Sequence, residues 1–441
     1  MKIFKSNYFA PISIALFISG FVTLRFGIKD SSIFSKNLWA EDGLFILCNL
    51  KVSPSNCFFD SYSGYLNLYS RFISYFISKF SIEDWAFINF LFYIVNVAVI
   101  ASIVSFLLQF KLGKIQTLLL ISIPYLLPIF SQQVIAVNAS FYLILVYYSL
   151  LITIFLDFNL TKIFNRQNIL IFFIYIITIF SNPLSMVLLF IFILKNLSEF
   201  KKQLIPILVL SISYIPQFLV VFTSNGNRTY VSDKILTLQI SLNYLIKTII
   251  STFYLKPDIL LLDPIFGQGQ IVGLIYKYSN FLFIFSLLIF LIFLFSNSYL
   301  IVLLKPAFLL VISMLVILLV SSYTNGSPER FLVLTSSLFV SFLMYLLSFI
   351  RFRFIYIPAL VLLLFTLSIP LNNNFANSEY RSTGPDWIEE VKQIRNICEV
   401  NNNSKLEFEF SPYWPTKNKH PYPFFEPTTN YITCNKLLKI S

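Results

Sequence analysis

The sequence predicts an all-α polytopic membrane protein with about eleven transmembrane helices, and three observations carry that prediction. Of the 441 residues, 57% are hydrophobic and only 12% are charged, and a soluble domain carries about twice that charged fraction. Apolar runs of about 18 or more residues recur from the first twenty residues to about residue 370. Short basic loops separate several of these runs. Together they exclude a soluble enzyme, a collagen-like chain and a disordered chain.

Several kinds of chemistry are excluded by what the sequence lacks. Its one histidine, His420, rules out a multi-histidine zinc site and makes a Ser-His-Asp triad in the membrane region implausible. There is no GxxxxGK[ST] motif of an ATP-driven pump. Four scattered cysteines are too few for an iron–sulfur cluster. Cationic loops beside membrane spans explain the net charge of +12, so we expect no nucleic-acid partner.

The predicted spans follow from hydropathy. The first apolar run, about residues 9–28, follows Lys2 and Lys5. The alternative is a signal peptide, but no small-residue cleavage site follows, so we expect an uncleaved helix with a cytoplasmic N-terminus. The further runs lie at roughly 86–109, 115–131, 140–158, 168–181, 184–196, 204–223, 242–262, 279–297, 306–323, 332–350 and 355–371.

Basic residues orient these spans. Four short loops fall on the side of the N-terminus if 242–262 is not a full crossing. They carry Lys111 and Lys114, Lys162 and Arg166, Lys195 with Lys201 and Lys202, and Arg351 and Arg353. Segment 242–262 contains Lys247, Lys256 and Pro257, which favours an interfacial or re-entrant helix. The predicted outer regions are then a polar loop at 29–83, a loop at 224–278, the short turn 323–331 and a tail.

The C-terminal tail, 372–441, follows the predicted transmembrane domain, 1–371. We expect the tail to be a small extracytoplasmic α+β segment. A helix is predicted to begin at Pro385-Asp386, and its apolar face comprises Trp387, Val391, Ile394 and Ile397. Alternation of Leu406, Phe408 and Phe410 with acidic residues predicts a strand.

The cysteines fall in two pairs on the predicted outer side. Cys48 and Cys57 share the first outer loop, and Cys398 and Cys434 share the tail. Two pairs on one side of a membrane indicate an oxidising compartment and two disulfides. The alternative is four free thiols.

The stretch Trp39-Ala40-Glu41-Asp42-Gly43 carries the clearest chemical signal. Two adjacent carboxylates beside a membrane span are unusual in so charge-poor a chain. Either acid could serve as a general base that accepts a proton from a sugar hydroxyl. The alternative is structural: one of them caps a loop helix or pairs with Arg71 or Arg330. We favour Glu41 slightly as the base, because an Asp beside Gly is a common turn former.

A second element follows in the same loop. Tyr62-Ser63-Gly64-Tyr65-Leu66 precedes an amphipathic stretch, 66–80, which we expect to lie in the membrane interface. Its apolar side comprises Leu68, Phe72, Tyr75, Phe76 and Phe80, and its polar side comprises Arg71 and Lys79.

Three further polar groups fall on the predicted outer side. Asn138 closes an outer turn, and Asn182-Pro183 breaks an apolar run where unpaired carbonyls could bind a ligand. Glu329-Arg330 opens a late span, and an Arg there is suited to a lipid phosphate. The alternative for Arg330 is snorkelling to headgroups or pairing with Glu329.

The run Leu38–Phe45, followed by Tyr62–Leu66 and Arg71, resembles a family of bacterial membrane proteins. These are GT-C-type glycosyltransferases related to the serotype-converting O-antigen glucosyltransferases. Members share a Trp-Ala-Glu-Asp-Gly element after the first span and a Tyr-x-Gly-Tyr-Leu element before an interfacial helix. The looser similarities are Asn138, Pro183, Arg330, Trp387, Cys398, Pro412 with Trp414, and Cys434. Cys48 and Cys57 depart from the family pattern.

The resemblance implies a GT-C-like fold and inverting, single-displacement transfer of a sugar from a polyprenyl-phosphate donor to a lipid-linked or surface glycan. Glu41 or Asp42 would be the base, while Arg330 and Arg71 would hold the donor phosphate. Substrate contacts would come from Trp39, Tyr62, Tyr65, Asn138, Asn182 and Glu329. Some GT-C enzymes use a divalent metal and others do not; two adjacent acids do not decide this, and we expect no metal and no other cofactor.

The resemblance also implies location and partners. We expect the bacterial inner membrane, with transfer on its outer face, membrane lipids around the protein, and a flippase and a donor-lipid synthase as partners. A lipid-linked glycan flippase, polymerase or ligase is the alternative function, and a membrane scaffold is a third. A flippase is disfavoured because the predicted spans are almost free of charge at their centres.

Overall fold

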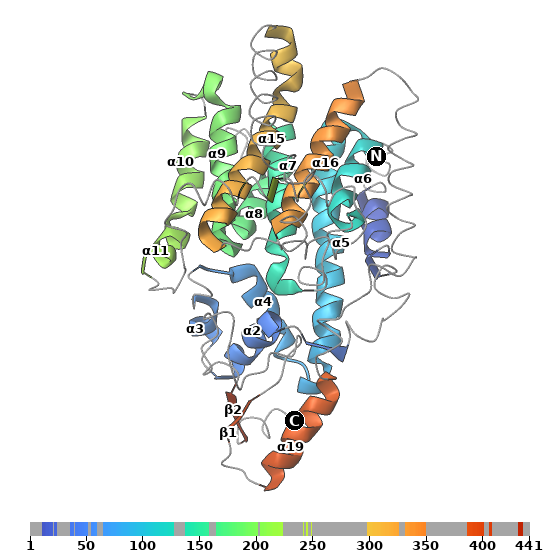
Figure 1. Ribbon diagram of the computed structural model, residues 1–441, viewed down its shortest axis with the longest axis vertical. Coiled ribbons are helices and arrows are strands. Elements are labelled where there is room, and N and C mark those ends of the chain that lie inside the picture. The colour runs from blue at the N-terminus through green and yellow to red at the C-terminus, as the bar shows by residue number, and fades with distance from the viewer. Residues whose placement is uncertain are drawn as a thin grey trace, which may run out of the picture.

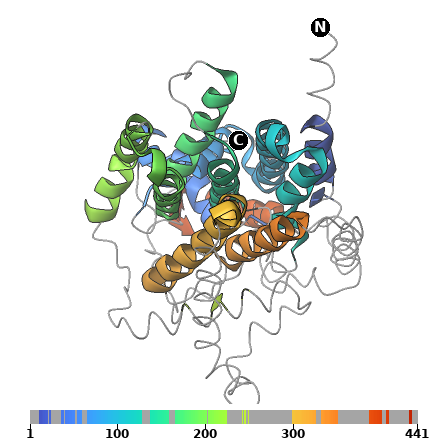
Figure 2. The same cartoon turned by 90° about the horizontal axis from the view of Figure 1, so that it is seen from above.

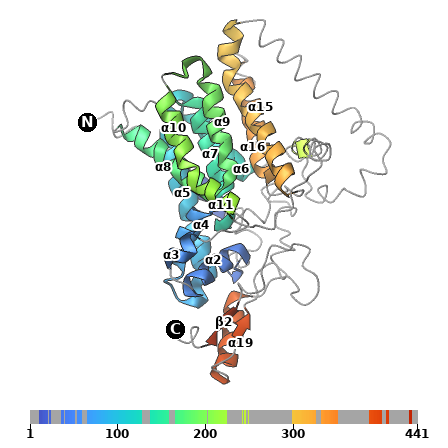
Figure 3. The same ribbon diagram turned by 90° about the vertical axis from the view of Figure 1, so that its left-hand side faces the viewer.

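The computed structural model is helical over most of the residues that it describes (Figure 1). These are 11–20, 22–23, 36–38, 40–51, 54–59, 65–127, 137–157, 165–201, 203–223, 241, 244–245, 248, 298–325, 331–349, 386–400, 405–407 and 431–434. A helical bundle forms the larger part, and a smaller helical layer with the tail lies beyond one end of it (Figures 1 and 3).

The bundle is built from nine labelled α-helices and the helix Pro11–Gly20, within the described residues. They are α5 (Trp85–Leu112), α6 (Lys114–Leu126), α7 (Tyr142–Phe155), α8 (Arg166–Ser181), α9 (Met186–Lys195), α10 (Leu204–Ser213), α11 (Ile215–Thr223), α15 (Ser298–Asn325) and α16 (Leu332–Phe349). Helices α15 and α16 lie side by side along one face (Figure 2). Short 3-10 turns precede or follow some of them: η1 (Ile82–Asp84), η2 (Asn138–Ser140), η4 (Pro183–Ser185) and η5 (Leu197–Glu199).

Three of the described helical stretches are long and apolar enough to cross a membrane: Ile82–Gln109, Asn138–Phe155 and Leu204–Val221. Helix α5 also turns a row of half-exposed apolar side chains outward, at four-residue intervals. That row comprises Phe87, Leu91, Val95 and Val99, and an outward apolar row suits a lipid surrounding. The total of eleven spans and the orientation remain predictions.

Helix α7 is the centre of the bundle, and every residue in it is buried. Hydroxyl groups join it to its neighbours. Tyr147 donates to the carbonyl of Leu120 on α6 at 2.7 Å, and Ser149 bonds Thr178 on α8 at 2.8 Å. Each such bond between helices in lipid contributes roughly 0.6–2 kcal/mol, so α7 is fixed to both neighbours by more than packing.

Basic residues from separate loops meet at one end of the bundle, here called the lysine end. Lys111, in the last turn of α5, and Lys195, at the end of α9, each lie 3.2 Å from a carboxylate oxygen of Asp157. Lys195 also donates to the carbonyl of Leu156 at 2.6 Å. These contacts place three of the chain's loops on one side, in agreement with the grouping that the basic residues predict.

The opposite end carries the first-loop segment, defined as residues 36–84. The sequence predicted a long polar loop over 29–83 with an amphipathic stretch at 66–80, and the structure adds helices to this loop outside that stretch. The segment consists largely of α2 (Ala40–Lys51), α3 (Pro54–Phe59), α4 (Leu68–Ile77) and η1. Apolar side chains of α2 drive the folding, since Leu44, Ile46 and Leu47 enter a core shared with Ile73 and Ile77 of α4.

Helix α4 confirms part of the predicted amphipathic stretch and corrects the rest. Phe72 and Phe76 are exposed, as expected for a helix with an aromatic face toward the membrane interface. Arg71, expected on a polar outer side, is instead only 4% exposed. It turns inward because its guanidinium finds a backbone carbonyl of α3 and the ring of Phe45.

Part of the 242–262 segment packs against α16. Ser241, Tyr244, Leu245 and Thr248 are helical and buried, and their spacing places them on one helix face. Thr248 bonds Thr335 through their hydroxyls at 2.9 Å. The contact lies near the start of α16, and the rest of the 242–262 segment lies outside the described residues.

The tail helix α19 (Trp387–Val400) docks on the first-loop segment. The Trp387 ring stacks on Trp85 with centroids 5.9 Å apart and planes 16° apart. The indole of Trp387 donates to the carbonyl of Ile82, and Arg395 pairs with Glu83. The described tail therefore shares one core with residues 38–86.

The remaining described tail residues form a small antiparallel pair. β1 (Lys405–Glu407) pairs with β2 (Tyr431–Thr433), with Leu406 opposite Ile432. A disulfide joins Cys398 to Cys434, with Cα atoms 5.1 Å apart. Phe408 and Phe410 of the predicted strand lie outside the described residues. The α+β tail as a whole remains a prediction.

One residue of the predicted apolar face of α19 was misplaced. Ile397 is 48% exposed, and Cys398 is buried in its place. A helix turns by about 100° per residue, so the eleventh residue after Trp387 returns to within about 20° of it, whereas the tenth lies about 80° away. Cys398 therefore completes the face.

We predict that Trp387→Ala frees the tail from the first-loop segment. The variant loses the stack on Trp85 and the bond to Ile82, a loss of about 3–5 kcal/mol for a buried Trp. Limited proteolysis of the purified protein should cut the tail at least tenfold faster. The control is Ile397→Ala on the same helix, which should match the wild type; equal resistance of the Trp387 variant would contradict the docking.

We predict a small, pH-dependent contribution of Asp157. Although desolvation by the neighbouring atoms raises its pKa, Lys195 and Lys111 outweigh that effect and lower the pKa below its usual range. Its contribution is then present above the unfolded pKa of about 3.9 and is lost as the pH falls through the lower folded pKa. Because Asp157 is exposed, the stability difference from Asp157→Asn should be under about 1 kcal/mol. Melting curves should show it between pH 5 and 7 and lose it on acidification; a difference that grows in acid would contradict the pairing.

Candidate functional site

The carboxylate of Asp42 is the centre of a buried polar cluster where the first-loop segment meets the bundle. Asp42 lies in the first turn of α2 and is fully buried. One oxygen accepts the backbone N–H of Ala139 at 2.7 Å. The other accepts the backbone N–H of Asn138 at 3.1 Å and the side-chain amide of Asn89 at 2.9 Å. Three donors suit an ionised carboxylate, which only accepts.

Asn138, predicted to contact substrate, uses its backbone and its side-chain amide in hydrogen bonds within the cluster. Its side-chain N–H groups donate to the carbonyl and the side-chain oxygen of Asn89, at 2.9 and 2.8 Å. Its side-chain oxygen accepts from Asn96 at 3.1 Å. Its backbone carbonyl accepts the hydroxyl of Ser70 at 2.8 Å. We therefore assign Asn138 a structural role, joining α4, α5 and η2.

A second contact ties α4 to the same turn. Asn67 precedes α4, and its side-chain amide donates to the carbonyl of Ala139 at 3.0 Å. The turn η2 thus receives donors from α4 and α5 and gives its own N–H groups to α2. We call Asp42, Asn67, Ser70, Asn89, Asn96, Asn138 and Ala139 the carboxylate network.

The two adjacent acids differ in their surroundings. The Asp42 carboxylate is occupied by the network, which favours the structural alternative for this residue. Glu41 precedes it in the first turn of α2, and its side chain lies outside the described residues. The network therefore fixes the backbone that carries Glu41, and the role of the Glu41 carboxylate remains a prediction.

Tyr65 and Leu66, from the second predicted element, are buried against the bundle. Gln217 of α11 bonds both backbone polar groups of Leu66, an arrangement called here the Gln217 clamp. Its oxygen accepts the Leu66 N–H at 2.8 Å, and its amide donates to the Leu66 carbonyl at 3.2 Å. This clamp fixes the backbone beside Tyr65.

Asn182 caps the turn η4, which follows it directly. Its side-chain oxygen accepts the N–H of Leu184 at 2.8 Å, and its carbonyl accepts from Ser185 through both the N–H and the hydroxyl. This is the capping role that Asn commonly takes before a helix. Among the described residues, those bonds account for the break in the apolar run without a ligand.

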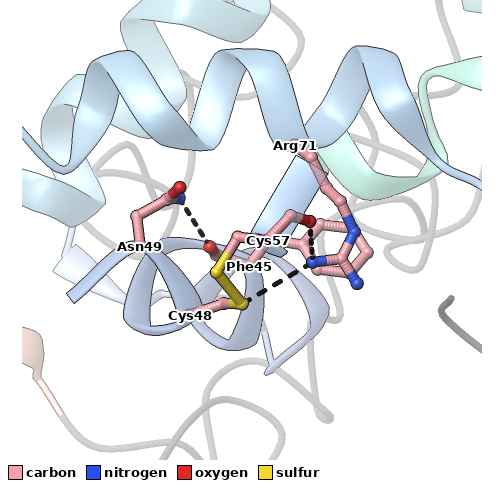
Figure 4. The surroundings of a disulfide bond; sticks show 5 residues. All are labelled: Phe45, Cys48, Asn49, Cys57 and Arg71. Atoms are coloured by element: carbon pink, nitrogen blue, oxygen red, sulfur yellow. Dashed lines mark hydrogen bonds between the residues drawn. A yellow bond between two sulfur atoms is a disulfide. The ribbon is translucent and has the colours of Figure 1, made fainter. Parts of the chain in front are cut away.

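Arg71, predicted to bind a donor phosphate, contacts the disulfide of the first-loop segment (Figure 4). Cys48 and Cys57 are joined, with Cα atoms 5.8 Å apart. The Arg71 guanidinium donates to the carbonyl of Cys57 at 2.7 Å and lies 4.7 Å from the centre of the Phe45 ring. Each of the two predicted cysteine pairs thus forms a disulfide. Arg71 bonds the backbone of the first one and so contributes to the packing of α2, α3 and α4.

Four predicted residues lie outside the described residues: Trp39, Tyr62, Glu329 and Arg330. Their roles remain predictions. Within the described ranges, no group of three or more His, Cys, Asp or Glu side chains is placed to hold a metal ion.

The sequence reasoning missed Asn89, Asn96, Asn67 and Gln217. A signal was present for the first two. Asn89 and Asn96 are seven residues apart in the otherwise apolar helix α5, so they lie on one face. Two amides at that spacing inside a membrane-length helix indicate a buried polar partner.

Comparisons with known proteins add no relative. The chain matched no protein-family model, no curated protein and no solved structure.

We predict that Asp42→Asn destabilises the first-loop segment. An amide at this position presents N–H groups to donors that need an acceptor, at a cost of about 2–4 kcal/mol. Thermal unfolding in detergent, followed by tryptophan fluorescence, should show a lower melting temperature. The control is Asn49→Ala on the same helix, because Asn49 bonds only its own helix carbonyl, that of Phe45, in the contacts described. An unchanged melting temperature would return Asp42 to the candidates for the base.

Proposed function

We propose that this protein is a glycosyltransferase of the bacterial inner membrane. It would transfer a sugar from a polyprenyl-phosphate donor to a lipid-linked or surface glycan, with inversion, on the outer face. Membrane-length helices support the membrane setting, and the resemblance of the first-loop motifs supports the reaction class.

One observation carries the proposal: the carboxylate network holds the start of α2 against the bundle, at the end opposite the lysine end. If the lysine end is cytoplasmic, as basic loops favour, Glu41 is carried on the outer side. A base needs a fixed backbone and access to substrate. The network supplies the first requirement.

The chemical step would be a single displacement. A hydroxyl oxygen of the acceptor attacks the anomeric carbon of the donor sugar, and the bond from that carbon to the phosphate oxygen breaks. Glu41 takes the hydroxyl proton, and the polyprenyl phosphate leaves as an anion that Arg330 would stabilise. Asp42 would orient this segment through the network.

Arg71 takes a different role from the one expected, whereas the aromatic residues keep theirs. Arg71 would support α2 and α3 rather than hold the phosphate, since its guanidinium already bonds the Cys57 carbonyl. Tyr65 would contact the sugar, and the Gln217 bonds to Leu66 would fix the backbone beside it. Trp39 and Tyr62 would offer further ring faces for the sugar.

We predict that Glu41→Gln abolishes transfer while the protein still inserts and accumulates. Mass spectrometry of the surface polysaccharide should show a hexose-sized mass with the intact gene and its loss on deletion and in the variant. The control is Glu389→Gln in α19, an exposed carboxylate distant from the network.

Other outcomes separate the alternatives. A mass lost on deletion but kept in Glu41→Gln would keep the enzyme class and reject Glu41 as the base. An unchanged repeat unit with altered chain length or amount would favour a polymerase or flippase. No change in the polysaccharide on deletion would contradict the proposal.

A further inference from the structure

Arg71 is a buried cation whose guanidinium contacts both helices of the pair α2 and α3, here called the α2–α3 hairpin. It is 4% exposed, and a buried guanidinium is destabilising unless its donors are bonded. One terminal nitrogen donates to the Cys57 carbonyl at 2.7 Å and lies 3.8 Å from the Cys48 sulfur. The Phe45 ring lies beneath it (Figure 4).

That hairpin depends on its disulfide. Phe45 and Cys48 belong to α2 and Cys57 to α3, and the bond closes a separation of nine residues. Helix α3 spans only six residues, and so short a helix is not stable alone. The disulfide therefore keeps the Cys57 carbonyl where Arg71 needs it.

The same helix α2 is fixed near both of its ends. Asp42 bonds η2 and α5, and Cys48 bonds α3, which Arg71 joins to α4. The two fixed points are six residues apart, about 9 Å along a helix axis. Loss of the second leaves the C-terminal half of α2 with its apolar packing on α4 but without its covalent link to α3, which loosens that half relative to Asp42.

We propose that Arg71 is a positioning residue and that the Cys48–Cys57 disulfide makes its action redox-dependent. In the oxidised protein Arg71 fixes α2 and α3 against α4. In the reduced protein α3 separates, Arg71 loses its carbonyl and α2 becomes mobile. The effect on sugar transfer rests on the proposed function, whereas the effect on α2 does not.

The redox step is thiol–disulfide exchange. The thiols of Cys48 and Cys57 give up two protons and two electrons to a disulfide of an extracytoplasmic oxidant, which becomes a dithiol. A dithiol reductant reverses the step and is itself oxidised to a disulfide. The switch would keep the transferase inactive until the first-loop segment reaches an oxidising compartment.

Hydrogen exchange of the α2 amides in the full-length protein tests this. We expect Cys48→Ser/Cys57→Ser and Arg71→Met to raise α2 exchange by about tenfold or more, and Arg71→Lys to restore part of the protection. Dithiothreitol added to Cys398→Ser/Cys434→Ser, which retains only the first disulfide, should raise α2 exchange reversibly. That protein without reductant is the control for the tail bond.

The outcomes are distinct. Unchanged α2 exchange in Arg71→Met and after reduction would overturn the proposal. If α2 exchange stays the same but the Arg71 variants raise the KM for donor lipid, Arg71 is a phosphate ligand instead. If α2 exchange rises as expected but the wild type transfers no sugar, the positioning role stands and the proposed function fails. If both hold, the loss of transfer should follow the rise in exchange across the variants.

Discussion

The buried carboxylate of Asp42 is the interaction on which the arrangement of the first-loop segment depends. A charge removed from water must be matched by donors, and here they come from α5 and from the turn η2. Helix α5 runs for 28 residues through the bundle. The bond from Asn89, near its start, to Asp42 therefore fixes α2 relative to the bundle. The bonds of Asp42 to α5 and η2 set the position of α2, and the apolar core then packs α2 with α4 and the tail helix.

Bonded polar groups also organise the bundle interior. Apolar packing alone distinguishes poorly between helix orientations in lipid, because the tails are as apolar as the side chains. The hydroxyl bonds from α7 to α6 and α8 require one particular orientation of these helices. Polar residues in this chain therefore specify which surfaces meet, and apolar residues supply the bulk of the contact.

Hydropathy predicts the helices well, because a membrane leaves the backbone little alternative. Within the first-loop segment the amphipathic stretch that contains α4 was predicted, whereas α2 and α3 were not, because they are short and their stability comes from packing on α4 and α19 rather than from their own pattern. The two acids show the same limit. Glu41 and Asp42 are neighbours in sequence, yet Asp42 is distinguished by partners 47 and 96 residues away, and no local pattern contains that information. The prediction that Ile397 lies on the apolar face of α19 was wrong for a simpler reason, because the ten residues from Trp387 do not make a whole number of helical turns.

The stacked pair Trp85 and Trp387 has a consequence for the order of assembly. The indole of Trp387 bonds a carbonyl 305 residues earlier in the chain. At about 5–20 residues per second, synthesis of the intervening chain takes roughly 15–60 seconds. For that time Trp85, at the beginning of α5, lacks the Trp387 ring that stacks on it in the folded protein. The core shared by the first-loop segment and α19 is thus completed only after α19 has been made, and a chain that stalls before Trp387 leaves the apolar side chains of that core exposed to misassembly.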